Sequence, residues 1–151
     1  GGAVAFLQKK LNLDADGISD LLNKKSGVLG ITELSSDMRE VEAACEKGDP
    51  KAILSMKMYN YRIKKYIGAY AAAMGGVDII VFTAGVGENQ WSTRQEACEG
   101  LEFLGVKIDK ELNKGLRGVE KVISTADSKV TVCIIPTDEE LMIATDTMEL
   151  L

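Results

Sequence analysis

The stretch Asp78-Ile79-Ile80-Val81-Phe82-Thr83-Ala84-Gly85-Val86-Gly87-Glu88-Asn89 decides the fold of this chain. It is an apolar, β-branched run that stops at two glycines, and a helix-like segment follows within a turn. The run at 79–82 predicts a buried strand, central in its sheet and parallel to its neighbours, because strands covered on both faces are continuously apolar. A glycine turn between such a strand and a helix is where α/β proteins hold phosphate groups, since backbone N–H groups and the helix N-terminus attract anions.

Helices and strands alternate along the chain around this stretch. Asp49 and Pro50 are typical of an N-cap and a first helical residue, and the helix that they open is expected to end near Met74. The alternation predicts an α/β fold in which helices pack on a partly parallel sheet, with a mainly helical segment at 1–76 and a strand-helix-strand-helix core at 77–151. The expected elements are helices at 3–11, 15–22, 38–46, 50–74, 91–101 and 137–149, strands at 79–82 and 131–135, a short strand at 121–124, weak helical character at 107–117 and a loop at 23–30.

The long helix carries one continuous apolar stripe. Its members recur at helical spacing and are Ile63, Tyr66, Ile67, Tyr70 and Met74. The basic residues between them lie off the stripe. This pattern favours a helix that faces the core and has a solvated basic edge over a face for nucleic acid or membrane.

Composition narrows the classes of function. The chain has 151 residues, 46% hydrophobic residues and a net charge of −5, which disfavours nucleic-acid and anionic-membrane binding because both need a basic face. No apolar run approaches the length of a membrane span, and no signal peptide is visible. The three cysteines are scattered, as in a reduced cytoplasmic protein. The absence of histidine excludes histidine catalysis and histidine metal ligands within this sequence.

The glycine pair admits two interpretations. Gly85 and Gly87 lack the third glycine of a dinucleotide-binding motif, and their strand comes late, so nicotinamide binding is disfavoured. The pair suits a tight turn that needs a positive φ, and it equally suits a loop that a ligand approaches closely. Glu88 and Asn89 favour a ligand, since a carboxylate and an amide both form hydrogen bonds, but Asn89 also suits the cap of the next helix.

Ser36-Asp37-Met38-Arg39 is interpreted first as a helix start. Ser36 is expected to cap the helix and Asp37 to complement the helix dipole, while Arg39 stays in solvent. Spacing alone therefore assigns this segment a structural role.

A carboxylate follows the last strand. Thr137 and Glu140 have the spacing of a capping box, so Glu140 has a structural role. Glu139 has none, and at the carboxyl end of a buried strand it is a candidate ligand for Mg²⁺, which takes only one or two protein carboxylates. The alternative for Glu139 is a solvated surface position.

Five phrases of the sequence together resemble the acetokinase family, within the actin, Hsp70 and sugar-kinase fold, which is ribonuclease H-like. They occur in the family's order and cover almost the whole chain. The phrases are Leu22-Asn23-Lys24-Lys25-Ser26-Gly27-Val28-Leu29-Gly30, Ser35-Ser36-Asp37-Met38-Arg39, Tyr61-Arg62-Ile63-Lys64-Lys65-Tyr66-Ile67-Gly68-Ala69-Tyr70, Phe82-Thr83-Ala84-Gly85-Val86-Gly87-Glu88-Asn89 and Ile135-Pro136-Thr137-Asp138-Glu139-Glu140-Leu141.

The resemblance implies reversible, Mg²⁺-dependent phosphorylation of acetate by ATP to give acetyl phosphate. It also implies a role for each matching position. The adenosine pocket would be lined by Asp37, Met38 and Arg39, the second nucleotide-binding loop would comprise Gly85, Val86, Gly87, Glu88 and Asn89, and Glu139 would bind the metal. Ala84 and Val86 stand where the family more usually has Gly and Ile, and neither departure removes the binding role.

The resemblance implies further that the chain is the C-terminal nucleotide-binding portion of a cytoplasmic homodimer, paired through this domain. The family's catalytic histidine and arginine would lie upstream, so the isolated chain is expected to be inactive. Two alternatives stay open: a kinase for another short-chain acid, propionate or butyrate, and a non-catalytic dimerisation or interaction fragment with a vestigial nucleotide site.

Overall fold

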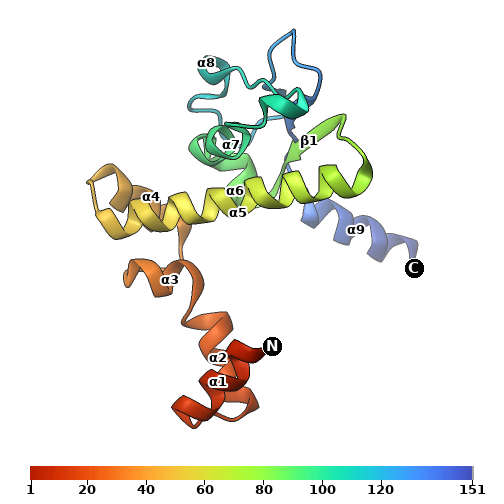
Figure 1. Ribbon diagram of the computed structural model, residues 1–151. Coiled ribbons are helices and arrows are strands. Elements are labelled where there is room, and N and C mark those ends of the chain that lie inside the picture. Colours follow the sequence, from red (N-terminus) through yellow and green to blue (C-terminus); the bar gives the residue numbers. More distant parts are fainter. Residues whose placement is uncertain (151) are drawn as a thin grey trace. The chain divides into compact units, whose positions relative to one another are not determined.

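The computed structural model describes residues 1–150, and the chain divides into two compact units. The first unit is Gly1–Tyr59 and the second begins at Asn60, so the boundary falls inside helix α5 (Pro50–Met74). Figure 1 follows the chain from the red helices of the first unit to the blue C-terminal helix of the second. Among the described residues, no helix has both the length and the apolar character needed to cross a bilayer.

The first unit is helical. Its elements are α1 (Gly2–Leu11), α2 (Ala15–Lys24), α3 (Gly27–Thr32), α4 (Met38–Glu46) and the beginning of α5. The core of this unit is small and consists of Val41, Ala52 and Met56, with Val28 and Met38 packed against it. The buried apolar residues of this cluster come from α4 and α5.

Helix α3 shows that the loop expected over residues 23–30 was wrong. Ser26 Oγ donates to the carbonyl oxygen of Leu21 at 2.8 Å and so closes the end of α2. Gly27, the first residue of α3, takes a φ of 65°, which turns the chain at the start of that helix. Val28 then reaches the core. The glycines resembled a loop signal, but one of them serves the junction between two helices and the apolar residue beside it is packed.

Aspartates begin both α4 and α5. Asp49 Oδ1 accepts hydrogen bonds from the main-chain N–H groups of Lys51 and Ala52 at 2.8 and 2.9 Å, which confirms the predicted start of the long helix. Its predicted end at Met74 is also confirmed. The expected cap at Ser36 was wrong. Asp37 is the N-cap of α4, because its extended backbone lets its carboxylate accept from Arg39 N–H at 2.9 Å.

The second unit contains a three-stranded sheet in the order β1–β3–β2. β1 (Ile79–Phe82) is parallel to β3 (Thr131–Ile134), and β2 (Lys121–Val122) is antiparallel to β3. Helices pack on this sheet, which confirms the predicted α/β fold. They are the second part of α5, α6 (Ala84–Asn89), α7 (Trp91–Cys98), the 3-10 helix η1 (Glu102–Leu104) and α8 (Lys110–Asn113). The last helix, α9 (Glu139–Glu149), follows β3 and has no buried residue.

One face of the sheet carries the core of this unit. Side chains of β1 and β3 meet those of α7 and the segment after it, and α5 packs against them. Alternate residues of each strand point to this face because successive side chains of a strand point in opposite directions. The buried cluster comprises Ile80, Phe82, Ala97, Cys98, Leu101, Val106, Ile123, Val130, Val132 and Ile134.

Within residues 1–150, β1 is not the central, doubly covered strand that its sequence predicts. Ile79 and Val81 are 57% and 45% exposed. In residues 1–150, β1 pairs with β3 alone and is therefore an edge strand. The core packs on the opposite face, where Ile80 and Phe82 lie. The outward apolar face of β1 consequently has no cover within the described chain.

The apolar stripe of α5 is only partly buried. Ile63 and Ile67 pack against the core, whereas Tyr66, Tyr70 and Met74 are exposed. The two tyrosine rings stack with centroids 6.1 Å apart. Strands of four residues span about 13 Å at the rise of a strand. The part of α5 from Asn60 to Met74 runs about 22 Å at 1.5 Å per residue. The two strands are therefore too short to cover its whole length, and part of the apolar stripe stays exposed.

The first residue of α6 has a strained backbone. Ala84 has a φ of 56°, and a side chain with a Cβ adopts this left-handed region at a cost of about 1–2 kcal/mol. Glycine avoids that cost but loses more conformational entropy on folding, about 0.4–1 kcal/mol.

We expect Ala84→Gly to raise the free energy of unfolding by about 0.5 kcal/mol, because relief of strain exceeds the entropic loss. Gly115 is the opposite control: its φ is 77° with no described atom within 4 Å of the place of a Cβ, so Gly115→Ala should lower stability by about 1 kcal/mol. Urea unfolding followed by circular dichroism measures both. A lower stability of Ala84→Gly would contradict the assignment of strain.

Candidate functional site

The carboxyl ends of β1 and β3 form the candidate site. The strands are parallel, with Phe82 opposite Ile134, so both leave the sheet at the same edge. Ile135 N–H donates to the Phe82 carbonyl oxygen at 3.0 Å and extends the ladder to that edge. Beyond it lie Thr83 on one strand and Thr137 on the other. Ligands of open α/β sheets bind outside the carboxyl ends of parallel strands.

The two glycines after β1 belong to a short helix, α6, and not to a turn with positive φ. The left-handed φ falls on Ala84, so the tight-turn interpretation of Gly85 and Gly87 was wrong. A Cβ at Gly87 would stand 3.1 Å from the carbonyl carbon of Phe82, and this glycine therefore lets α6 pack on the end of β1. At Gly85, apart from its chain neighbours and the backbone of α6, no described atom lies within 4 Å of the corresponding point, and the residue is exposed, so a group can approach it from that side.

Three side chains join the two strand ends. Thr83 Oγ1 and Thr137 Oγ1 lie 2.7 Å apart, and one hydroxyl donates to the other. Glu88 Oε1 accepts a hydrogen bond from the main-chain N–H of Thr137 at 2.7 Å. The structure thus brings Glu88, a predicted nucleotide-loop residue, onto the segment that precedes Glu139.

Asn89 bonds within its own helix. Its Nδ2 donates to the carbonyl oxygen of Gly85 at 2.9 Å. Helix α7 begins at Trp91 with Gln90 as its N-cap, so the alternative that Asn89 caps this helix was wrong. Val86, the remaining residue of the predicted loop, is half-buried on α6.

A buried arginine forms hydrogen bonds to the C-terminal part of α6. Arg94 has no exposed surface. Its Nη1 donates to the carbonyl oxygens of Gly87 and Glu88 at 2.8 and 2.9 Å, its Nη2 donates to that of Leu116 at 2.7 Å, and its Nε donates to Asn113 Oδ1 at 2.8 Å. Burial, reinforced by the charge of Arg117, lowers the pKa of Arg94 to about 10, so the guanidinium remains charged at neutral pH.

Sequence reasoning missed Arg94, although a signal existed. Arg94, Ala97, Cys98 and Leu101 fall at i, i+3, i+4 and i+7, so they share one face of a helix. All four are buried. An arginine within an otherwise apolar stripe marks a charge that enters the interior, and buried charges require compensating hydrogen bonds.

Asp37, Met38 and Arg39 lie in the first unit. Arg39 Nη2 donates to Asp37 Oδ2 at 2.6 Å, and this guanidinium lowers the pKa of Asp37 to about 2. Met38 packs against the small core of its unit. The Arg39 side chain is 88% exposed, so its planar guanidinium is accessible while the aspartate orients it.

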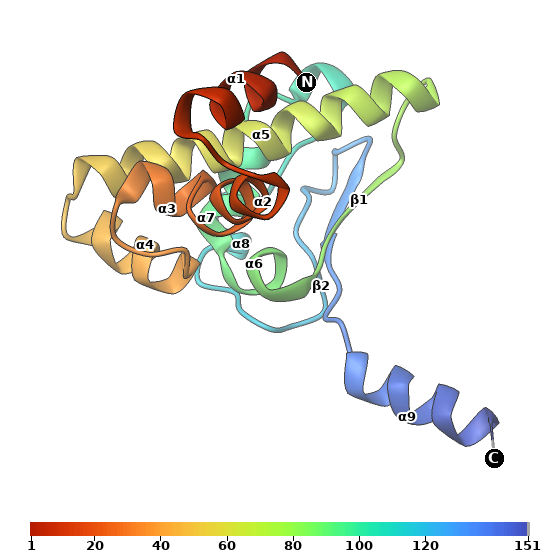
Figure 2. The ribbon, with the colours of Figure 1, turned by 90° about the horizontal axis from the view of Figure 1, so that it is seen from below.

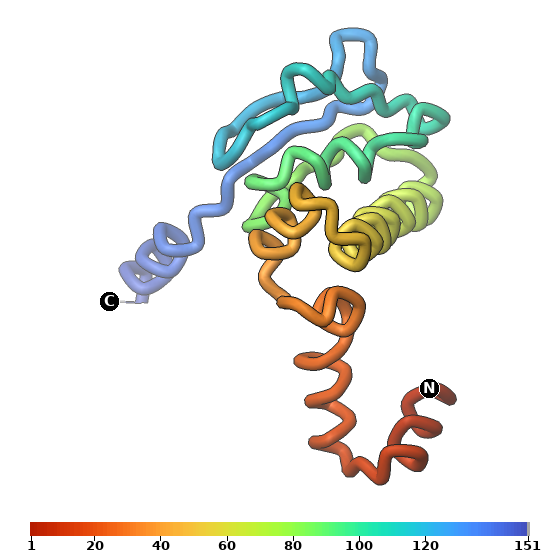
Figure 3. Tube along the Cα trace, turned by 90° about the vertical axis from the view of Figure 1, so that its left-hand side faces the viewer, coloured from red at the N-terminus to blue at the C-terminus, as the bar shows by residue number. Residues whose placement is uncertain are grey.

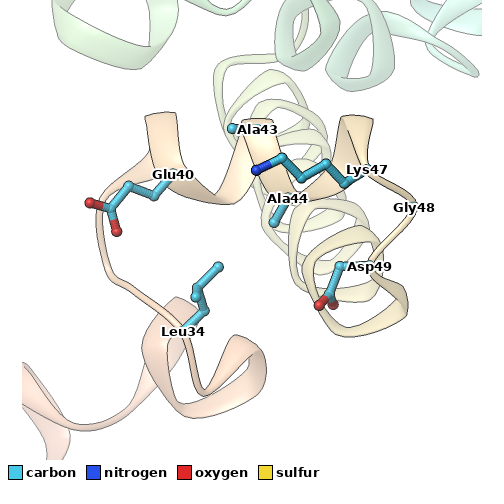
Figure 4. A pocket seen from close by; sticks show the side chains of 7 residues that line it. All are labelled: Leu34, Glu40, Ala43, Ala44, Lys47, Gly48 and Asp49. Carbon is cyan, nitrogen blue, oxygen red and sulfur yellow. The ribbon is translucent and has the colours of Figure 1, made fainter.

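A hollow in the same unit does not collect these three residues. Its volume is about 610 Å³, and its lining mixes both signs of charge. Figure 4 shows α4 contributing one wall and Asp49 standing at the beginning of α5. Asp49 already caps that helix. The lining residues are Leu34, Glu40, Ala43, Ala44, Lys47, Gly48 and Asp49.

Glu139 is the first residue of α9, and its side chain is exposed. The capping box predicted for Thr137 and Glu140 was wrong. Asp138 is the N-cap, and its Oδ1 accepts from Leu141 N–H at 3.0 Å. The N–H and hydroxyl of Thr137 are already bonded to Glu88 and Thr83, so the helix begins two residues later than expected.

The residues present suit a metal that arrives with a substrate. The described residues contain no group of three or more acidic, cysteine or histidine side chains able to hold a metal ion. Mg²⁺ usually takes one or two carboxylates and fills its other positions with water and substrate phosphates. A single exposed carboxylate at Glu139 fits this kind of binding.

We expect Arg94→Met to lower the free energy of unfolding by about 3 kcal/mol or more, because each unpaired buried acceptor costs about 1–3 kcal/mol. Arg94→Lys restores part of the bonding and should fall between Arg94→Met and the unchanged chain. The control is Arg62→Met at an exposed position of α5, where a change below about 1 kcal/mol is expected. Urea unfolding measures all three. Equal losses in Arg94→Met and Arg62→Met would show that these bonds do not stabilise the fold.

Comparison with known proteins gives one consistent result along the chain. The model of the Acetokinase family matches residues 1–145. A curated acetate kinase from Phocaeicola vulgatus is 69% identical over 150 residues, which are 99% of this chain and 37% of that protein. The chain therefore spans a little over a third of the length of this relative.

Solved structures show the same similarity in three dimensions. The crystal structure of Porphyromonas gingivalis acetate kinase matches 98% of this chain and 37% of its own, with a TM-score of 0.93 and 59% identity. A propionate kinase from Francisella tularensis matches 96% of this chain and 36% of its own, with a TM-score of 0.84 and 34% identity. Because the family match covers nearly the whole sequence, the resemblance seen in the five phrases is confirmed, and the chain belongs to the acetokinase family.

Proposed function

We propose that the full-length protein is an acetate kinase that reversibly transfers the γ-phosphoryl group of ATP to acetate and forms acetyl phosphate. The observation that carries this proposal is the 69% identity to a curated acetate kinase across 99% of the chain. The arrangement at the carboxyl ends of β1 and β3 agrees with this proposal. After β1 the chain can be approached at Gly85, and after β3 it continues to the carboxylate of Glu139.

In this proposal the chain binds the nucleotide. Gly85, Val86 and Gly87 present the main chain of α6 to the phosphates, and Glu88 and Asn89 complete that loop. On the first unit, Asp37, Met38 and Arg39 line the adenosine pocket. Guanidinium groups stack on planar rings, and the exposed Arg39, oriented by Asp37, suits that task.

Glu139 is the proposed metal contact. Mg²⁺ bound with the nucleotide would neutralise charge on the phosphoryl group during transfer. Glu139 would hold it directly or through a water molecule, and its place in the first turn of α9 keeps the carboxylate exposed. Phosphoryl transfer depends mostly on positioning and charge neutralisation, so a single well-placed carboxylate has a measurable effect.

We assign acetate binding and the charged groups that act on the moving phosphoryl to the rest of the protein. The sequence contains no histidine, and the chain matches only 37% of a full-length acetate kinase. The isolated chain is therefore proposed to be inactive. We further propose a cytoplasmic homodimer paired through this domain, for which the exposed Tyr66, Tyr70 and Met74 of α5 offer apolar surface.

A second candidate is a kinase for propionate, or by the same logic butyrate. The 34% identity to the Francisella propionate kinase favours it to a smaller degree. Acyl selectivity depends on the pocket for the acid, which we assign to the rest of the protein, so comparison of acetate, propionate and butyrate as substrates of the full-length enzyme separates these candidates.

We expect the full-length protein to convert ATP and acetate to acetyl phosphate and the isolated chain of 151 residues to show no turnover. Acetyl phosphate is trapped as the hydroxamate and measured by colour. Calorimetric titration of the isolated chain with ADP tests whether the nucleotide site is functional or vestigial. Turnover by the isolated chain would contradict the assignment of acetate binding and of the charged catalytic groups to the rest of the protein.

We expect Glu139→Gln in the full-length enzyme to raise the Mg²⁺ concentration for half-maximal activity by roughly tenfold, since a lost or weakened metal contact has effects of this order. Glu140→Gln is the matched control, because it removes the same charge from the neighbouring exposed position. Both variants should unfold at nearly the same urea concentration as the unchanged enzyme. Equal metal requirements in the two variants would remove Glu139 from the metal site.

A further inference from the structure

We propose that Glu88 is a positioning residue whose carboxylate fixes the segment that carries Glu139, and that it does not contact the nucleotide. The contact between Glu88 and Thr137 is a feature of the fold. Its consequence for metal binding rests on the proposed function. The proposal replaces the role of direct nucleotide ligand that the family resemblance implied for Glu88.

The segment between β3 and α9 has few hydrogen-bond donors that can fix its position. Pro136 has no N–H to donate, so Thr137 supplies the first main-chain donor after Ile135. That donor is bonded to Glu88 Oε1 at 2.7 Å, and the Thr137 hydroxyl is bonded to Thr83. Two residues later the helix begins with Glu139.

Helix α9 contributes little to its own placement. None of its residues is buried. Figures 2 and 3 show the blue helix projecting away from the sheet and helices of the second unit. Within the described chain, the bonds at Thr137 are therefore the main fixed point from which the position of the Glu139 carboxylate is set.

Glu88 is well suited to be that fixed point, because its own main chain is anchored. Its carbonyl oxygen accepts from Arg94 Nη1 at 2.9 Å and from Gly118 N–H at 3.1 Å. Arg94 is buried and bonded on three sides. A carboxylate that accepts from a main-chain N–H makes a charge-assisted bond, which is short and about twice as strong as a neutral one.

Charge also argues against direct contact between Glu88 and phosphate. An ionised carboxylate only accepts hydrogen bonds, and so do the phosphate oxygens of a nucleotide at neutral pH. The two groups repel each other unless a donor or a metal lies between them. Engagement with the Thr137 N–H gives Glu88 a donor within the protein and leaves the open main chain at Gly85 for the ligand.

The first test is amide hydrogen exchange at Thr137 in the full-length protein, without nucleotide or metal. Glu88→Ala removes the acceptor and should reduce protection of the Thr137 amide by roughly tenfold, the factor for one hydrogen bond. Glu88→Gln keeps a carbonyl oxygen at the same reach and should retain most of the protection. Unchanged exchange in Glu88→Ala would overturn the proposal.

The second test separates positioning from ligand contact. Glu88→Ala should raise the Mg²⁺ concentration for half-maximal activity by roughly tenfold, while the Kd for ADP in EDTA stays within about twofold, and Glu88→Gln should largely restore the metal response. Thr83→Val, which removes only the hydroxyl partner, should show a smaller shift in the same direction. Two results would overturn the proposal. One is a weaker Kd for ADP in EDTA in Glu88→Ala, which would indicate direct contact with the nucleotide. The other is an equal rise in the Mg²⁺ requirement in Glu88→Ala and Glu88→Gln, which would indicate direct contact with the metal.

The two proposals fail in different ways. If the full-length protein makes no acyl phosphate, the proposed function fails, but exchange at Thr137 still reports on the contact. If turnover is normal and the Thr137 amide exchanges equally in all variants, only the positioning role fails. Urea unfolding of Glu88→Ala excludes a general loss of structure as the cause of either result.

Discussion

The candidate site depends on a buried positive charge. The guanidinium of Arg94 donates to three main-chain carbonyl oxygens and one side-chain amide, and two of those carbonyls belong to α6. A helix of six residues is too short to be stable by itself, because the cost of the first turn exceeds what a few hydrogen bonds return. Arg94 satisfies the carbonyl groups that α6 leaves open at its end, so the helix persists and its first turn stays directed at the edge of the sheet.

Parallel pairing gives this edge its chemistry. Because Phe82 lies opposite Ile134, the residues that follow the two strands emerge together, and two threonine hydroxyls come within 2.7 Å although they are 54 residues apart in sequence. A shift of register by one residue would turn every side chain of β1 to the other face and separate these groups. The core residues that fix the register therefore also determine the geometry of the site.

The sequence predicted the elements better than it predicted the contacts. Helix α5 begins and ends where its cap signals place it, and both principal strands lie within their expected bounds. The capping box predicted at Thr137, by contrast, does not form, because Thr137 bonds to Thr83 and Glu88 instead. Both residues are distant in sequence, so no local pattern reveals this competition. Arg94 did have a local signal, a charge within an apolar stripe, but its acceptors come from α6, from α8 and from the loop after α8, and no local pattern identifies them. The individual roles of the predicted binding residues stay predictions, because they depend on a ligand.

Within residues 1–150, β1 lies at the edge of the sheet, and this position has a consequence for handling the isolated chain. Among the described residues, no strand pairs with the outer backbone of β1, which lies beside the exposed side chains of Ile79 and Val81. Such an edge recruits strands from other molecules, because main-chain pairing is indifferent to sequence. Natural edges discourage this with charges or bulges, and the four residues of β1 contain neither. Self-association of the purified chain would begin at this strand and would grow steeply with concentration.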